Sequence, residues 1–299
     1  MTTGTNVLNV VVVFSLLITG GMMKASEKPE SKQPVGGDAD KAMPQWDGKE
    51  SIADYAKRVG LEPTLALDLG NKVKLELVLI PAGKFTMGKL SSEEDHGNNK
   101  TQHEVTLTKP FYIGKYTVTQ EQYQQVMGSN PSNFKGKDNP VEMVSLDDAQ
   151  EFCKKLGQTT NQTLRLPTDA EWEYACRAGT STSYYSGDTE NDLKRVAWYA
   201  ANSNGTTHPV GQKEPNRFGL FDMHGNVWQW CQDWYEEYKP DTVTDPQGPA
   251  KGVVRVLHGG SWNFAPFMCR SVSRDNGFPG HRCSHFGFRV VVATASRTH

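Results

Sequence analysis

The stretch PNRFGLFDMHGNVWQW, residues 215–230, decides the fold class of this protein. Two turn signals precede a pair of tryptophans, and neither a helical nor a strand period persists through it. Similar turns recur from about residue 180 to residue 280, as in NSNG, DPQGP, HGGS and DNGFPG. A loop-rich region this long inside one domain needs disulfides, metal ions or dense aromatic packing. The aromatic side chains available are Trp198, Tyr199, Phe218, Phe221, Trp228, Trp230, Trp234 and Trp262.

Three helices are predicted before this region, because three segments each begin with a hydroxyl side chain and end at a glycine. The predicted spans are 119–128, 145–157 and 168–179. In the first and third, Gln122 and Glu171 follow the hydroxyl by three residues, which is the capping-box pattern. Cys153 lies on the apolar face of the second helix, so we expect it in the core.

Strands are predicted on both sides of these helices. VKLELVLIPAGKFTMG, residues 73–88, is predicted as a β-hairpin, because alternating residues precede a Pro-Ala-Gly turn. Residues 103–119 contain two further strand-like stretches, and FGFRVVVA at 286–293 predicts a final strand. A short helix is expected within 49–63, where apolar residues recur at helical spacing. Together these elements predict an α+β, loop-rich mixed fold in a single domain.

Composition excludes some classes of partner. The chain has 299 residues, a net charge of −2 at pH 7 and a pI near 6.5. Since no basic excess is present, neither nucleic acid nor an anionic membrane surface is expected as a partner. The oligomeric state is not indicated by the sequence.

The N-terminal part differs from the rest of the chain. The apolar run NVLNVVVVFSLLIT, residues 6–19, is too short to span a bilayer comfortably and has the length of a signal-peptide core. Residues 1–25 are therefore predicted to be a signal peptide or an uncleaved N-terminal anchor, and the protein to be exported to the periplasm or the extracellular space. Residues 26–72 are predicted as a polar linker with a short helix, and residues 73–295 as the folded domain.

Six blocks in order carry a resemblance. They are FTMG, FYIGKYTVTQEQYQQVMG with the following NPVEMVSLDDAQEFC, RLPTDAEWEYACRAG, PNRFGLFDMHGNVWQW, HGGSW and GFRV. From about residue 75 to residue 294 the chain resembles the formylglycine-generating enzyme family, also called the sulfatase-modifying-factor domain. The resemblance implies a fold similar to C-type lectins. It also implies an oxidoreductase that converts a cysteine of a protein substrate to formylglycine with oxygen.

The copper site of that family is incomplete here. Family members of known activity hold Cu(I) between two cysteines in a stretch shaped GGS-x-x-C-x4-C, because two soft thiolates suit Cu(I). Counted from Ser261, the first position falls on Phe264 and the second on Cys269. Aligned instead on RSVSR, residues 270–274, Cys269 falls on neither position. No C-x4-C occurs in the sequence, so copper is doubtful as a cofactor.

Cys269 therefore has three interpretations: a copper thiolate with an unrecognised partner, one half of a disulfide, or a packed thiol. The resemblance implies that the helix carrying Cys176 is bridged to this region, which would make Cys176 the disulfide partner. The five cysteines, an odd number, leave at least one thiol over. The family's other bridge joins the position of Cys153 to that of Val290, so this disulfide is lost.

Two further motifs suggest metal ions. GLFDMHGNVWQW resembles the calcium loop of the family, and the resemblance implies a structural Ca²⁺ held by Asp222, the carbonyls of Gly225 and Val227, and Gln229 in place of a carboxylate. In HRCSH, residues 281–285, alternating histidine and cysteine side chains would share one face of a strand and bind Zn²⁺ or copper. The alternative is a solvated loop.

Two functions follow. The first is an exported thiol oxidase acting on a protein or peptide substrate, with Cys269, Ser261 and Trp228 in a variant site. The second is a non-catalytic module that binds a peptide or a glycan, with Ser261, Trp228 and Trp262 lining the recognition pocket.

Overall fold

The computed structural model describes residues 43–89 and 101–294. The chain separates into two units, Met1–Ala39 and Asp40–His299, and every described residue belongs to the second. The predicted signal peptide or anchor at 1–25, and the predicted linker as far as residue 42, lie outside the described residues. Within the described ranges, no helix is long and apolar enough to cross a membrane.

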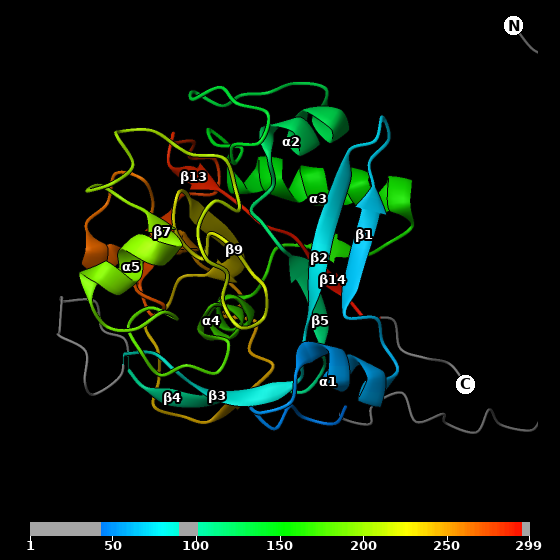
Figure 1. The fold of residues 1–299 in the computed structure, drawn as a ribbon, viewed down its shortest axis with the longest axis vertical. Coiled ribbons are helices and arrows are strands. Elements are labelled where there is room, and N and C mark those ends of the chain that lie inside the picture. Colours follow the sequence, from blue (N-terminus) through cyan, green and yellow to red (C-terminus); the bar gives the residue numbers. More distant parts are fainter. Residues whose placement is uncertain (1–42, 90–100, 295–299) are drawn as a thin grey trace, which may run out of the picture. The chain divides into compact units, whose positions relative to one another are not determined.

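A five-stranded sheet organises one side of the unit, with strands in the order β1-β2-β5-β14-β6 (Figure 1). All its neighbouring strands are antiparallel. Its strands are β1 (Thr64–Asp68), β2 (Lys74–Ile80), β5 (Phe111–Gly114), β6 (Leu164–Arg165) and β14 (Val291–Ala293). The helices α1 (Ile52–Val59), α2 (Gln120–Met127) and α3 (Leu146–Thr160) contribute side chains to the same core.

The folded unit begins earlier than residue 73. β1 pairs with β2 along its whole length, and Tyr55 and Ala56 of α1 are fully buried in the same core as Leu77. Burying these side chains stabilises the folded state by about 25 cal/mol for each Å² of apolar area that is removed from water. Residues 43–72 are therefore part of the domain, and the short helix predicted within 49–63 is confirmed as α1.

The second side of the unit contains shorter strands. A four-stranded sheet has the order β12-β11-β9-β13, a three-stranded sheet the order β10-β4-β3, and β7 pairs with β8. The strands are β3 (Gly83–Met87), β4 (His103–Leu107), β7 (Ala197–Trp198), β8 (His224–Gly225), β9 (Trp228–Trp234), β10 (Val243–Thr244), β11 (Arg255–His258), β12 (Arg274–Gly277) and β13 (Phe286–Gly287). The α+β, loop-rich class predicted from the sequence is confirmed.

Two strand predictions were wrong in their pairing. β2 and β3 do not form a hairpin, because β2 pairs with β1 and β5 while β3 pairs with β4 in another sheet. The chain crosses between the sheets at Ala82, whose N–H donates to the Tyr55 hydroxyl. The single strand predicted at 286–293 is also divided, into β13 and β14, which belong to different sheets. Arg289, between them, is fully buried.

The three predicted helices are confirmed at their N-termini. Each has its hydroxyl cap, and all three have a capping box. Their ends differ in two cases: α3 continues through Gly157 to Thr160, and α4 (Asp169–Arg177) ends before Ala178, which takes the left-handed conformation. A further helix, α5 (Glu190–Val196), was not predicted, although Thr189 and Asp192 form its capping box.

Helix α4 lies between the sheets and is seen end-on in Figure 1. All nine of its residues are buried, including charged ones. Glu173 and Arg177 pair at 2.9 Å inside the protein, and Arg165 forms two hydrogen bonds of 2.6 Å with Glu171. Cys153 is buried in the core, as predicted.

Candidate functional site

The cysteine loop, residues 259–269, follows β11. Gly259 and Gly260 have φ values of 99° and 73°, a region that glycine enters without strain. A Cβ on Gly260 would lie 2.5 Å from the Cys269 sulfur. The loop thus closes on itself through η1 (Pro266–Cys269), which brings Cys269 beneath the glycine turn.

Cys269 is a packed thiol in this structure. It is fully buried in a cluster with Tyr184, Leu193 and Tyr199, and burial raises its pKa to about 12. All five cysteines are free, so the bridge to Cys176 is not formed. A thiol with so high a pKa is not a ready nucleophile or metal ligand, because both roles need the thiolate.

Ser261 and Trp228 lie with Cys269 in the protein interior. Both are fully buried. The Ser261 hydroxyl donates to Asn263 Oδ1 at 2.7 Å, and the Trp228 ring meets Phe264 edge to face at 5.5 Å. All three predicted site residues are therefore buried, and none of them presents a side chain to solvent.

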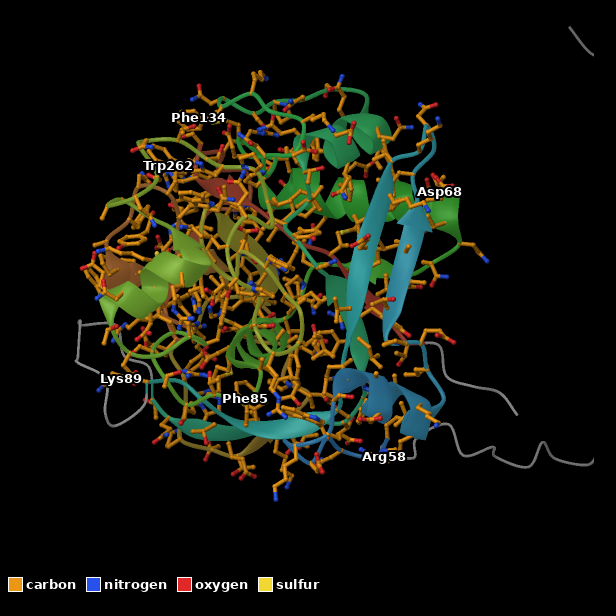
Figure 2. The ribbon with its side chains drawn as sticks, in the orientation of Figure 1. Arg58, Asp68, Phe85, Lys89, Phe134 and Trp262 are labelled. Carbon is orange, nitrogen blue, oxygen red and sulfur yellow. The ribbon has the colours of Figure 1, made fainter. Side chains whose placement is uncertain are left out.

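Four partly exposed aromatic side chains lie next to Trp228, through the Phe264 ring, and form what we call the aromatic rim: Phe134, Trp262, Phe264 and His285. Phe134 and Trp262 meet edge to face at 5.2 Å, and Phe264 contacts His285 at 5.5 Å. All four side chains are half-buried. Figure 2 shows Phe134 and Trp262 next to each other, far from Phe85 and Arg58. Such a partly exposed aromatic group is a common anchor for a binding partner.

Glu142 supports the rim and was missed by the sequence analysis. It is fully buried, and its Oε1 accepts the Phe134 N–H at 2.7 Å while Oε2 has no hydrogen-bond partner. Burial raises its pKa to about 7. The only sequence feature that could have indicated a buried Glu142 is its place between the apolar residues of NPVEMV. The burial itself depends on the tertiary fold.

The residues present do not fit the family's copper site. The position counted as the first cysteine is Phe264, whose ring packs on Trp228, and Cys269 is protonated by its burial. Neither side chain supplies the soft thiolate that Cu(I) prefers.

The predicted calcium ligands are engaged in another network. The Gln229 Oε1 atom accepts hydrogen bonds from Trp172 Nε1 and Arg289 Nε, each at 2.7 Å. Its amide nitrogen donates to the Asp222 carbonyl at 2.8 Å. Because both acceptor positions of Gln229 are used and a guanidinium lies beside it, the residues do not fit Ca²⁺ in this arrangement.

The Asp222 carboxylate caps a loop. Its Oδ2 accepts the Gly211 N–H at 2.8 Å, and burial raises its pKa above the ordinary value. Gly225 and Val227, whose carbonyls were the other predicted ligands, are both buried beside β9. This loop is held by its own hydrogen bonds in the structure.

The HRCSH segment does not form a three-ligand cluster. His281 Nε2 lies 3.3 Å from the Cys283 sulfur, while His285 belongs to the aromatic rim. Among the residues the structure describes, no group of three or more histidine, cysteine or acidic side chains is placed to hold a metal ion. The solvated-loop alternative fits the exposure of His281.

A second polar cluster, which we call the Asp169 network, lies at the start of α4 and was not predicted. One oxygen of Asp169 accepts from His258 Nε2 at 2.6 Å and from the Tyr238 hydroxyl at 2.9 Å, and the other pairs with Arg274 at 2.7 Å. The His258 ring stacks on Trp172 at 4.4 Å. Burial opposes the charge of Asp169, but Arg274 and His258 hold its pKa below the ordinary value.

Comparisons with known proteins agree with this architecture. The sequence model of the sulfatase-modifying factor enzyme 1-like domain matches residues 69–294. The chain is 33% identical over 237 residues to the chaperone protein LppX of Paenibacillus barcinonensis, covering 62% of this chain and 78% of that protein. It is 34% identical over 282 residues to the formylglycine-generating enzyme of Streptomyces coelicolor, covering 72% and 88%. It is also 32% identical over 246 residues to the serine/threonine-protein kinase pkn1 of Chlamydia pneumoniae. That alignment covers 72% of this chain but only 38% of the kinase.

Two solved structures share the fold. Treponema denticola variable protein 1 superposes with a TM-score of 0.72 at 33% identity, covering 77% of this chain and 99% of that protein. PvdO from Pseudomonas aeruginosa gives a TM-score of 0.68 at 29% identity, covering 78% and 99%. The mixed α+β architecture predicted from the resemblance is therefore confirmed.

Proposed function

This chain belongs to the sulfatase-modifying factor enzyme 1-like domain family, and from this premise we propose that it is an exported binding protein that holds a protein or peptide segment on its aromatic rim. The observation that carries the proposal is the state of Cys269. The only thiol of the cysteine loop is fully buried and protonated, while Trp262 and Phe264 of the same loop are partly exposed. The scaffold of the family is kept, but its thiol chemistry is not supported.

A peptide suits the rim because aromatic anchors supply contact area at low conformational cost. Trp262 is fixed in place, since its Nε1 donates to the Ser284 carbonyl at 3.0 Å and its N–H to the Asn226 carbonyl. Asn263 is exposed beside it and offers an amide to a peptide backbone. The similarity to a protein named as a chaperone favours a protein ligand over a glycan.

Trp262→Ala is predicted to weaken peptide binding by at least about tenfold, because truncating an aromatic hot spot removes well-packed contacts. Peptides would be selected from a displayed random library against the wild type, and affinities measured by fluorescence anisotropy. Phe85→Ala, an aromatic truncation on β3 far from the rim (Figure 2), is the matched control. Enrichment of no peptide, together with binding on a glycan array, would instead support the glycan alternative.

No formylglycine is expected when the purified protein is incubated with a Cys-x-Pro-x-Arg peptide, Cu(I), oxygen and a reductant, because no pair of thiolates is available. Mass spectrometry of the peptide measures the conversion, beside a Cys269→Ser variant. Conversion by the wild type and not by Cys269→Ser would overturn the binding proposal in favour of a thiol oxidase.

Export rests on the apolar run at 6–19 and the polar segment after it. N-terminal sequencing of the protein recovered from the periplasm or the medium tests it. An intact N-terminus in the cytoplasmic fraction would contradict export.

A further inference from the structure

A cavity of about 240 Å³ lies at the start of α4, next to the end of β9 and the segment 236–249. No residue of the aromatic rim lines it. Its volume is below the roughly 300–1,000 Å³ of pockets for drug-sized ligands. A single side chain or a small ligand therefore matches its size.

The cavity is lined by two adjacent buried carboxylates with different environments. Asp169 is fully engaged with Arg274, His258 and Tyr238 in the Asp169 network. Asp233, only 3% exposed, accepts the Asp169 N–H through Oδ2 at 3.0 Å. Among residues 43–89 and 101–294, no basic side chain forms an ion pair with Asp233. A buried carboxylate without a counter-charge is costly for a protein to ionise.

The cavity has an excess of acidic side chains. The acids among its lining residues are Asp169, Asp233, Glu236, Glu237 and Asp241, against the bases Lys239 and Arg274, with His103 also present. Since Arg274 is already paired with Asp169, the other lining side chains carry more negative than positive charge, which favours a cation.

The chemistry of the walls favours an organic cation over a metal ion. Met87, Val243 and Pro249 contribute apolar surface to the lining, which suits an alkyl chain. A metal ion would need several converging ligands, and the described residues place no group of three or more for that purpose. We propose that this cavity binds an alkylammonium or guanidinium group, of the kind carried by lysine, arginine or a polyamine, with Asp233 as its counter-ion.

The affinity of this cavity for a cation should depend on pH. Burial, with the nearby charge of Asp169, raises the pKa of Asp233 to about 8. A cation prefers the ionised carboxylate, so affinity should rise by up to about tenfold per pH unit below pH 8 and level off above it. Besides the cavity residues named above, the groups around Asp233 are Glu171, Arg165, Cys231 and Arg255.

The test is calorimetric titration of the full chain with butylamine and with Nα-acetyl-lysine N-methylamide, using butanol as the uncharged control. Saturable binding of the amines at pH 8.5, weaker at pH 6.5 and lacking for butanol, is the expected result. Tighter binding of the lysine derivative would assign the site to a peptide side chain, and equal binding to a free amine. Repeating the pH series with His103→Gln shows how much of the pH dependence of amine affinity comes from His103 and how much from Asp233.

Asp233→Asn should weaken amine binding by at least about tenfold, because a charge-assisted hydrogen bond is replaced by a neutral one. It is isosteric and keeps an oxygen for the Asp169 N–H. Asp241→Lys, at an exposed position, tests the same site if Asp233→Asn does not fold, since it adds a competing cation. Lys72→Ala, at an exposed position outside the cavity, is the control variant and should leave amine affinity unchanged. The proposal fails if amines do not bind at pH 8.5, or if neither Asp233→Asn nor Asp241→Lys changes their affinity.

Discussion

Replacing Arg289 by alanine is expected to destabilise the protein by about 3 kcal/mol or more, because it removes a fully buried guanidinium from three buried hydrogen-bond acceptors. The guanidinium is fully buried and donates to Gln229 Oε1, to the Gly114 carbonyl and to the Phe221 carbonyl at 2.7–2.8 Å. These acceptors come from β9, from β5 and from the segment between β7 and β8. Alanine would leave them buried without donors, at about 1–3 kcal/mol for each unsatisfied group.

Urea unfolding followed by circular dichroism measures this effect. Domains of this kind are stable by about 5–15 kcal/mol, so Arg289→Ala would remove a large fraction. Arg282→Ala is the control: Arg282 pairs with the Asp148 carboxylate at 2.7 Å, but its side chain is half exposed. An exposed pair contributes about 0–1 kcal/mol. Equal losses for the two variants would refute the role assigned to Arg289.

Replacing Asp169 by alanine is the second large effect, with an expected loss of about 3–5 kcal/mol at pH 7. The change leaves Arg274, itself almost fully buried, without its carboxylate, and it removes the acceptor of His258 and Tyr238. Asp147→Ala, in the first turn of α3 and exposed, should change stability by no more than about 0.5 kcal/mol.

The pH dependence of the same variant gives an independent check. The folded-state pKa of Asp169 is lowered from 3.8, so its contribution is present above the unfolded pKa and is lost as the pH falls through the folded one. The stability difference between wild type and Asp169→Ala should therefore shrink below about pH 4. A difference that stays constant from pH 7 down to pH 2 would contradict the ionised state of Asp169.

Local sequence patterns predicted what local forces decide. The hydroxyl at each helix start satisfies backbone N–H groups within the same turn, so Thr119, Ser145 and Thr168 were identified without any tertiary information. Helix ends were less certain, because a glycine such as Gly157 permits an end without requiring one. The helix α3 continues past it, since Leu156 and the preceding apolar residues are held in the core.

The candidate site could be predicted only in part. The HGGSW and GNVWQW segments suggested Ser261, Trp228 and Cys269 as candidate site residues, and the structure buries all three. Their burial could not be read from the sequence, because it depends on side chains from distant segments: Cys269 packs with Tyr184, Leu193 and Tyr199. The Asp169 network had no signal either, since Asp169 and His258 are 89 positions apart.

By itself, the sequence determined the family, the α+β class, the positions of the helix starts and the absence of a C-x4-C pair. These depend on residue identity and short-range order. The tertiary structure alone decided that β2 and β3 belong to different sheets and that Cys269 is a protonated, packed thiol. It also decided that Gln229 faces a guanidinium and that Asp233, beside a cavity, forms no ion pair with a described residue. Strand pairing, desolvation and charge compensation depend on groups that only folding brings together.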